Sequence, residues 1–203
     1  MLEGLDKIDW SQLKHAYGAA SDVPGLIRSL LSDSKSERDE AIHNLFGNIY
    51  HQGTVYEATA FAIPFLIEVL SSPATSNKSS VAALLASIAD GTGYLETHTS
   101  YGSGEVVWRR ILAEKGETLE SELVRERLLT DQVRSEAAKG LYLLTPFLFD
   151  NDPEVRMSVA EALGAFPEHR ETHLRLLVEA LSIEADWEVQ EVISESMDRL
   201  NAN

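Results

Sequence analysis

The 203-residue chain contains no cysteine. This absence excludes disulfide bonds, catalysis by a thiolate and every zinc site built on cysteine ligands. The longest apolar runs fall well short of the roughly 18 residues that span a bilayer, and the first residues lack the basic start and apolar core of a secretory signal. We therefore expect a soluble, cytoplasmic protein with no attachment to a membrane.

Basic residues are scarce. The chain has 17 Lys and Arg against 33 Asp and Glu, which gives a formal net charge of −16. The imbalance is greatest from Asp150 onward, where 13 acidic residues stand against four arginines and no lysine. Such a surface repels nucleic-acid phosphates and favours basic protein partners. The alternative interpretation is an acidic surface that only keeps the protein soluble.

The motifs of common cofactor and catalytic sites are also missing. The glycine pairs in residues 91–93 and 102–104 lack the further glycine or the Lys-Ser/Thr of phosphate-binding loops. His169 and His173 have the spacing of metal ligands on a helix, but no His-Glu-x-x-His pattern accompanies them, and we expect them at the surface. No nucleophile and base stand in a recognisable arrangement. The sequence predicts no cofactor, no metal and no enzymatic activity.

What the chain does contain is an internal repeat. The segment Pro24-Gly25-Leu26-Ile27-Arg28-Ser29-Leu30 is echoed 40 residues later by Pro64-Phe65-Leu66-Ile67-Glu68-Val69-Leu70. A shorter echo, Pro146-Phe147-Leu148-Phe149, follows after a further 82 residues. A period near 40 is typical of stacked helical hairpins, none of which can bury its apolar face alone.

Apolar residues at helical spacing extend this pattern into paired segments on both sides of the middle of the chain. We predict an all-α fold, a right-handed α-solenoid of about four to five antiparallel helical hairpins in a single domain, 1–203. The regular repeats cover about 22–90 and 132–200. Residues 91–131 break the rhythm: 91–104 has the composition of an irregular polar loop, and a divergent hairpin follows.

Helix starts follow from capping residues. Asp9 predicts a short lead-in helix that reaches about Tyr17, and Asp22 and Asp152 are expected to cap later helices. Thr54 and Glu57 have the spacing of a capping box, after a helix that ends at Gly53. No segment shows a strand pattern.

The turn and helix start Asp152-Pro153-Glu154-Val155-Arg156, with Ala160 and Leu163, resembles the core motif of HEAT repeats. In that family a turn aspartate and an arginine at the start of the second helix link neighbouring hairpins. Arg38, Lys78 and Gln190 align with Arg156, so only one repeat keeps the full pair. The chain is also similar to small bacterial HEAT-repeat proteins, some of which are immunity proteins that neutralise secreted toxins. A toxin partner is implied by this resemblance alone.

In the HEAT arrangement the second helices line the concave side, which suggests three candidate surfaces. The first is a polar stripe of Asn44, Asn48, His51, Ser79 and Ser87. The second is the loop with Tyr94, His98 and Tyr101, and the third is the acidic face with Glu188, Glu191 and Glu195. Two alternatives stay open: Asn48 and His51 only tie down the turn at Gln52-Gly53, and the loop is disordered.

These features favour a non-enzymatic module that binds a basic protein partner through its concave face, with an immunity-type inhibitor of a basic toxin as the specific version. One alternative is a small-ligand sensor that uses the loop at 91–104. Another is a HEAT-like nucleic-acid-processing enzyme, which the net charge disfavours unless basic residues converge. The residues concerned are Lys35, Arg38, Lys78, Arg109, Arg110 and Arg134. The sequence gives no oligomeric state.

Overall fold

The computed structural model describes residues 2–202, and helices dominate them, as the all-α prediction requires. The α-helices are α1 (Val23–Ser29), α2 (Lys35–Asn48), α3 (Glu57–Leu70), α4 (Lys78–Ala89), α5 (Tyr94–Thr99), α6 (Gly104–Glu114), α7 (Leu119–Leu144), α8 (Pro153–Gly164), α9 (Arg170–Ile183) and α10 (Trp187–Ala202). Short 3₁₀-helices cover Leu5–Lys7, Trp10–Gln12, Thr145–Phe149 and Pro167–His169. Two small antiparallel ribbons complete the set: β1 (Lys14–His15) with β2 (Gly18–Ala19), and β3 (Tyr50–His51) with β4 (Thr54–Val55).

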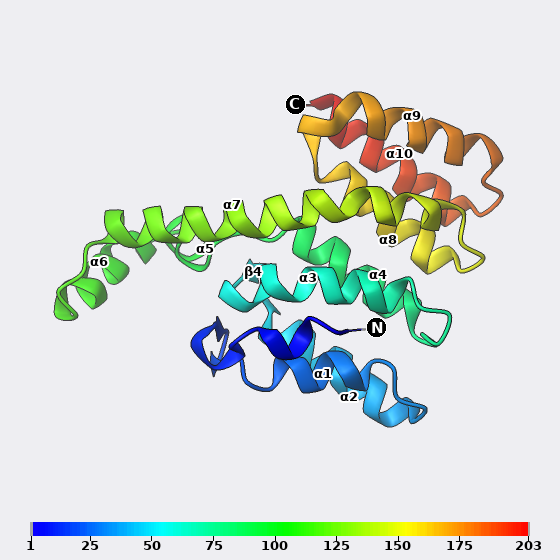
Figure 1. Ribbon diagram of the computed structural model, residues 1–203. Coiled ribbons are helices and arrows are strands. Elements are labelled where there is room, and N and C mark those ends of the chain that lie inside the picture. The colour runs from blue at the N-terminus through cyan, green and yellow to red at the C-terminus, as the bar shows by residue number, and fades with distance from the viewer. Residues whose placement is uncertain (1, 203) are drawn as a thin grey trace.

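Four pairs of helices stack into one array (Figure 1). The pairs are α1 with α2, α3 with α4, the C-terminal half of α7 with α8, and α9 with α10. The second helices form a continuous layer, because α4 packs on α8 and α8 packs on α10. We call the outer side of this layer the second-helix face. The predicted solenoid is confirmed, with the pair around residues 91–131 left out of the stack.

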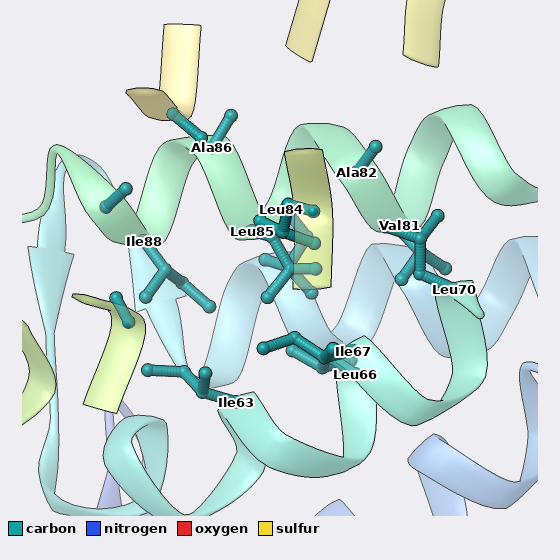
Figure 2. Close-up of a cluster of buried hydrophobic side chains, with 14 of the residues drawn as sticks. Ile63, Leu66, Ile67, Leu70, Val81, Ala82, Leu84, Leu85, Ala86 and Ile88 are labelled. Carbon is teal, nitrogen blue, oxygen red and sulfur yellow. The ribbon is translucent and has the colours of Figure 1, made fainter. Parts of the chain in front are cut away.

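The core lies between successive helices of the array (Figure 2). Figure 2 shows Ile63, Leu66, Ile67 and Leu70 of α3 meeting Val81, Leu84, Leu85 and Ile88 of α4. Burying one such side chain contributes about 1.5–3 kcal/mol, so the interface between two helices carries much of the stability. Gly140 lets α7 approach α3 closely, since a Cβ there would lie 2.2 Å from Cδ1 of Ile67. A larger residue at 140 would require the end of the Ile67 side chain to move.

Arg156 links the third and fourth pairs. Its Nη1 donates to the carbonyl of Asp150 at 2.8 Å, and its Nε and Nη2 donate to the Glu184 carboxylate at 2.7 and 2.9 Å. Glu184 lies in the turn before α10, so this pair joins neighbouring hairpins, as the HEAT motif implies. The hydrogen bond from Arg156 lowers the pKa of Glu184. Asp152 does not pair with Arg156; it caps α8 by accepting from Glu154 N at 3.0 Å.

The corresponding link is incomplete at Arg38. Its Nη1 donates to the carbonyls of Ser32 and Asp33 at 2.7 and 2.9 Å, in the same way as Arg156. The residue aligned with Glu184 is Ser72. Its side chain is too short to reach the Arg38 guanidinium in the way that the Glu184 carboxylate reaches Arg156. Accordingly, Arg38 Nε is buried without a hydrogen-bond partner among residues 2–202.

The middle of the chain forms a projecting element that we call the arm, residues 94–131. It consists of α5, α6 and the N-terminal half of α7, which extends beyond the array with α6 beneath it (Figure 1). The prediction of an irregular loop at 91–104 is wrong for residues 94–99, which form α5. No helix ends near residue 131, because α7 is one helix of 26 residues that continues from the arm into the array. No glycine or proline interrupts it there, and its apolar stripe simply changes from facing α6 to facing α3.

The structure of the N-terminal region differs from three further predictions. The lead-in helix ends at Gln12, and residues 14–19 form the β1–β2 ribbon instead of continuing to Tyr17. Neither Asp9 nor Asp22 accepts a capping hydrogen bond at its helix start. Gly53 does not end α2; with Gln52 it forms the two-residue turn of the β3–β4 ribbon, at φ of 88° and 51°.

The start of α3 also differs from the predicted capping box of Thr54 and Glu57. The residue before the helix is Tyr56, whose backbone N–H donates to Thr59 Oγ1 at 2.8 Å. Glu57 is the first residue of α3, and its carboxylate accepts from the backbone N–H of Lys14 at 3.0 Å. Glu57 therefore attaches the β1–β2 ribbon to the second pair of helices.

Candidate functional site

A hollow of about 250 Å³ crosses the second-helix face, and we call it the acidic groove. It is lined by Tyr50, Ala86, Ser87, Asp90, Glu161, Val192, Glu195, Ser196 and Arg199. These residues come from α4, α8 and α10, which pack side by side, and from β3. The stacking of three successive pairs thus builds the groove, and no single hairpin could form it.

Negative charge dominates the acidic groove. Asp90, Glu161 and Glu195 project from three successive second helices, and Arg199 is the cation among the lining residues. Arg199 Nη2 donates to Asp90 Oδ1 at 2.7 Å. Burial raises the pKa of Glu161; Arg199 opposes this rise, and the carboxylates of Asp90 and Glu195 add to it. A raised carboxyl pKa means that an added cation would be favourable at this position.

Small and aromatic residues give the acidic groove its polar hydroxyls. Ser196 is only 3% exposed and makes no hydrogen bond with another residue in 2–202. It packs beside Gly164, where a Cβ would lie 2.9 Å from the Ser196 Cβ, so α8 and α10 are close here. Burial raises the pKa of the Tyr50 phenol, and Asp90 adds to this effect. Tyr50 is therefore a neutral hydroxyl at physiological pH.

The predicted acidic face continues the acidic groove along α10. Glu195 lines the groove itself, while Glu191 and Glu188 lie one and two turns nearer the start of the helix, with exposed side chains. The sequence did not single out Asp90, Glu161 or Arg199. Arg199 and Asp90 are 109 residues apart, and only the stacking of α4, α8 and α10 brings them together.

The predicted polar stripe is divided between two places. Ser87 lies in the acidic groove, and Ser79 lies two turns earlier on α4, half-buried. Asn48 instead donates its Nδ2 to Asp22 Oδ2 at 2.6 Å. His51 is not on α2 but in β3, which corrects its expected position on the helix face. Asn44 is half-buried on α2, one turn before Asn48.

Asn48 and His51 belong to a polar network around the β1–β2 ribbon. Asp22 accepts from Asn48 and, through its other oxygen, from His15 Nε2 at 3.0 Å. The backbone N–H of Tyr17 donates to His15 Nδ1 at 3.0 Å, and the Tyr17 hydroxyl lies 3.3 Å from His51 Nδ1. These bonds attach the ribbon to the first pair of helices. Asn48 and His51 thus have structural partners, but these lie at Asp22 and Tyr17 and not in the Gln52-Gly53 turn.

The predicted loop residues lie on the arm. Tyr94 stacks on His98 with ring centres 4.0 Å apart and meets Trp108 edge-on at 5.5 Å. Tyr101 is 78% exposed, at the turn between α5 and α6. Tyr94 and His98 therefore form part of a packed aromatic group, whereas Tyr101 lies outside it.

The basic residues considered for a nucleic-acid surface come from α2, α4, α6 and α7. Most are held by acceptors of the chain: Lys35 by Asp39, Arg38 by two carbonyls, Lys78 by Asp150, Arg109 by Glu105 and Glu120, and Arg134 by Glu168. Their charge is therefore largely compensated inside the protein.

His169 and His173 do not share the expected surface position. His173 is 5% exposed, and its Nδ1 donates to the Leu163 carbonyl at 2.8 Å, while its burial lowers the pKa of its imidazole. Over residues 2–202, no group of three or more His, Asp or Glu side chains is placed to hold a metal ion. In the same part of the chain, no helix is both long and apolar enough to span a membrane.

Stacked helical pairs with a continuous core define an α-helical repeat protein. Residues 116–198 match the family model for HEAT repeats. This segment holds the third and fourth pairs, with the Arg156–Glu184 link between them. Over these residues the chain is similar to HEAT repeats, and the stacked pairs give it the fold of an α-helical repeat protein.

Two solved structures are similar to the chain at low identity. One is the crystal structure of an engineered protein, a structural-genomics target, with 21% identity over 89% of this chain and 79% of that chain, at a TM-score of 0.36. The other is a designed armadillo repeat protein, with 16% identity over 88% of this chain and 100% of that chain, at a TM-score of 0.26. We draw no conclusion from similarities at this level. The curated proteins include no significant match.

Proposed function

We propose that this protein is a non-enzymatic interaction module that binds a basic protein partner through its second-helix face. HEAT repeats generally mediate protein–protein interactions. The observation that carries the proposal is the acidic groove, where three carboxylates from α4, α8 and α10 surround the single guanidinium of Arg199. Burial is the main cause of the raised pKa of Glu161, and Asp90 and Glu195 add to it; a lysine or arginine of the partner would offset the contribution of these carboxylates.

The charge pattern also supports a specific mode of capture. Glu188 and Glu191 continue the negative surface beyond the acidic groove, so an approaching basic protein meets a wide negative field before it docks. Such complementarity speeds association and makes it sensitive to salt. A basic toxin such as a nuclease fits this surface, in line with the immunity role implied by the resemblance. In that version the module would occlude the toxin's nucleic-acid-binding site.

The test compares two double variants that lose the same charge. Glu161→Gln/Glu195→Gln removes two carboxylates from the acidic groove, whereas Glu171→Gln/Glu179→Gln removes two exposed carboxylates from α9. Each is used with the unaltered protein to capture partners from a lysate of the native host at low and moderate salt. We expect one stoichiometric basic protein, retained by the α9 variant and lost with the groove variant.

The same experiment can contradict the proposal. Equal loss in both double variants would mean that only the overall net charge matters. Retention of the partner by the groove variant at moderate salt would place its binding surface elsewhere. With the partner in hand, its dissociation constant should rise steeply with salt for the unaltered protein and less steeply for the groove variant.

A further inference from the structure

A second hollow, of about 570 Å³, lies where the arm joins the array, and we call it the arm cleft. Its walls come from β1, from the end of β4 and the start of α3, from the start of α5 and from the N-terminal half of α7. The lining residues are Leu13, Lys14, Val55, Tyr56, Glu57, Phe61, Tyr94, Leu95, Glu122, Arg125, Glu126, Leu128, Leu129 and Gln132. None of them lines the acidic groove. A hollow of this volume is in the range of small-molecule sites.

Apolar side chains form much of the arm cleft. Leu13, Phe61 and Leu129 are half-buried, and Leu95 is buried at its base. Leu128, also in the lining, is 66% exposed. An apolar body placed here would remove these side chains from water, which is favourable and non-directional.

The acceptors in the arm cleft are already engaged. Glu57 accepts from the backbone N–H of Lys14, and Glu122 accepts from Arg125 Nη1 at 2.6 Å. Both oxygens of Glu126 are used, since they accept from the backbone N–H groups of Leu95 and Glu96 at 2.7 and 2.9 Å. Each of the three carboxylates therefore contributes to the wall of the cleft and has less capacity left for a ligand's donor.

The cleft also has cationic and hydroxyl groups that are not fully engaged. Within residues 2–202, neither the Lys14 ammonium nor the Tyr94 hydroxyl makes a hydrogen bond or ion pair with another side chain. Arg125 has further guanidinium N–H groups beyond the one that Glu122 accepts. A cleft with a partly apolar wall, engaged carboxylates and an open ammonium suits a ligand with an apolar body and an anionic acceptor group.

We propose that the arm cleft binds a small amphipathic carboxylate. Its apolar body packs on Leu13, Phe61 and Leu129, and its carboxylate accepts from Lys14 Nζ. The proposal does not rest on the basic partner, because the two sites share no residue. It gives the arm a function that the regular array could not supply, since the cleft exists only where α7 leaves the array.

The test uses three probes with the same ten-carbon chain: decanoate, decanamide and decylamine, each below its micelle concentration. Binding is measured by calorimetry and located by amide chemical-shift changes. Lys14→Gln removes the proposed partner of the carboxylate, and Lys35→Gln removes the same charge from α2, far along the chain. Phe61→Ala removes part of the apolar wall.

We expect saturable binding of decanoate, with shift changes at residues 13–14, 56–61, 94–95 and 125–132. Lys14→Gln should weaken decanoate binding about two- to fivefold and leave decanamide unchanged, the effect of losing one exposed charged contact. Lys35→Gln should have no effect, and Phe61→Ala should weaken decanoate and decanamide alike. The proposal is overturned if decylamine binds as tightly as decanoate, if Lys14→Gln and Lys35→Gln behave alike, or if no saturable binding occurs.

Discussion

The array and the arm are built from the same kind of helix but are held together differently. The array has one continuous core that runs from Leu2 to Leu200 through every pair. The arm has a separate small cluster, in which Leu95, Leu112 and Leu119 are buried and Trp108 and Leu123 pack around them. A helix in the array is supported by neighbours on two sides, whereas the arm depends on a few contacts of its own.

This difference assigns different roles to the two regions. The acidic groove lies across three helices of the continuous core, so the helices that carry its carboxylates are held in place before any partner arrives. The arm cleft has one wall on the array and one on the arm, and Glu126 fastens α5 to α7 across that junction. Local opening costs less where fewer apolar contacts are lost. The arm is therefore the region expected to move first.

The largest effect should come from Val159→Asp in the array. Val159 is 2% exposed on α8, between α4 and α10, so the variant would place an unpaired carboxylate in the continuous core. We expect the free energy of unfolding to fall by about 4 kcal/mol or more. The measurement is urea denaturation followed by circular dichroism. Val178→Asp is the matched control: Val178 is 51% exposed on α9, and this variant should unfold near the wild-type midpoint.

A substitution in the core of the arm should destabilise the arm but not the array. Leu112→Ala removes one of the three buried leucines and should destabilise the arm by about 2–4 kcal/mol. Amide exchange should become faster in α5, α6 and residues 119–131, while exchange in α3 and α4 stays unchanged. Leu84→Ala, in the core of the array, should instead lower the global stability. If Leu112→Ala lowers the protection of α4 as much, the arm and the array unfold as one unit.

The array was predictable because its signals are local and repeated. The echo at Pro24 and Pro64 set the period, and Asp152-Pro153 marked the start of α8 where the structure has it. The arm was less predictable, since α7 changes its packing partner without any break in helical pattern. The residues near 131 favour a helical conformation whether one helix or two is present, so they do not distinguish the two alternatives.

The candidate sites divide in the same way. The acidic face of α10 followed from composition, and Glu195 does line the acidic groove. Asp90 and Glu161 could not be added to it from sequence, because their proximity is a product of stacking. For Asn48 the helix was predicted correctly but its partner was not: Asp22, directly before α1, lies beside Asn48 because α1 packs on α2.

The next effect in size concerns the link between the third and fourth pairs. Glu184→Gln should lower the free energy of unfolding by about 1–3 kcal/mol at neutral pH, because it weakens two charge-assisted hydrogen bonds from Arg156. The Glu184 side chain is 8% exposed, so solvent screens this pair little. Urea denaturation at pH 7 measures the change. Glu179→Gln, on the exposed side of α9, is the control and should be close to wild type.

The pH dependence of the same variant sharpens that result. The hydrogen bond from Arg156 holds the pKa of Glu184 below its ordinary value of 4.5. The unfolded chain therefore binds the proton first as pH falls, so the stabilisation is present above about pH 4.5 and is lost as pH falls through the lower folded pKa. The difference between wild type and Glu184→Gln should shrink in that acidic window. A constant difference down to pH 3 would mean that the pair contributes through packing and not through charge.

The smallest effect, and one of opposite sign, is expected for Glu161→Gln in the acidic groove. Burial and the carboxylates of Asp90 and Glu195 raise the pKa of Glu161, so its charged form destabilises the fold at neutral pH. The folded protein then binds the proton before the unfolded chain as pH falls, so the cost declines as pH falls through the raised folded pKa and is gone below the ordinary value of 4.5. The variant should be more stable than wild type at pH 7, by less than about 1 kcal/mol because solvent reaches this residue, and equal to it at acidic pH. Thermal denaturation at several pH values, with Glu179→Gln as control, measures both. If Glu161 lowers the stability of the fold yet increases the affinity for the partner, the array keeps this charge for binding. If Glu161→Gln is less stable than wild type at pH 7, Arg199 already compensates the charge of Glu161.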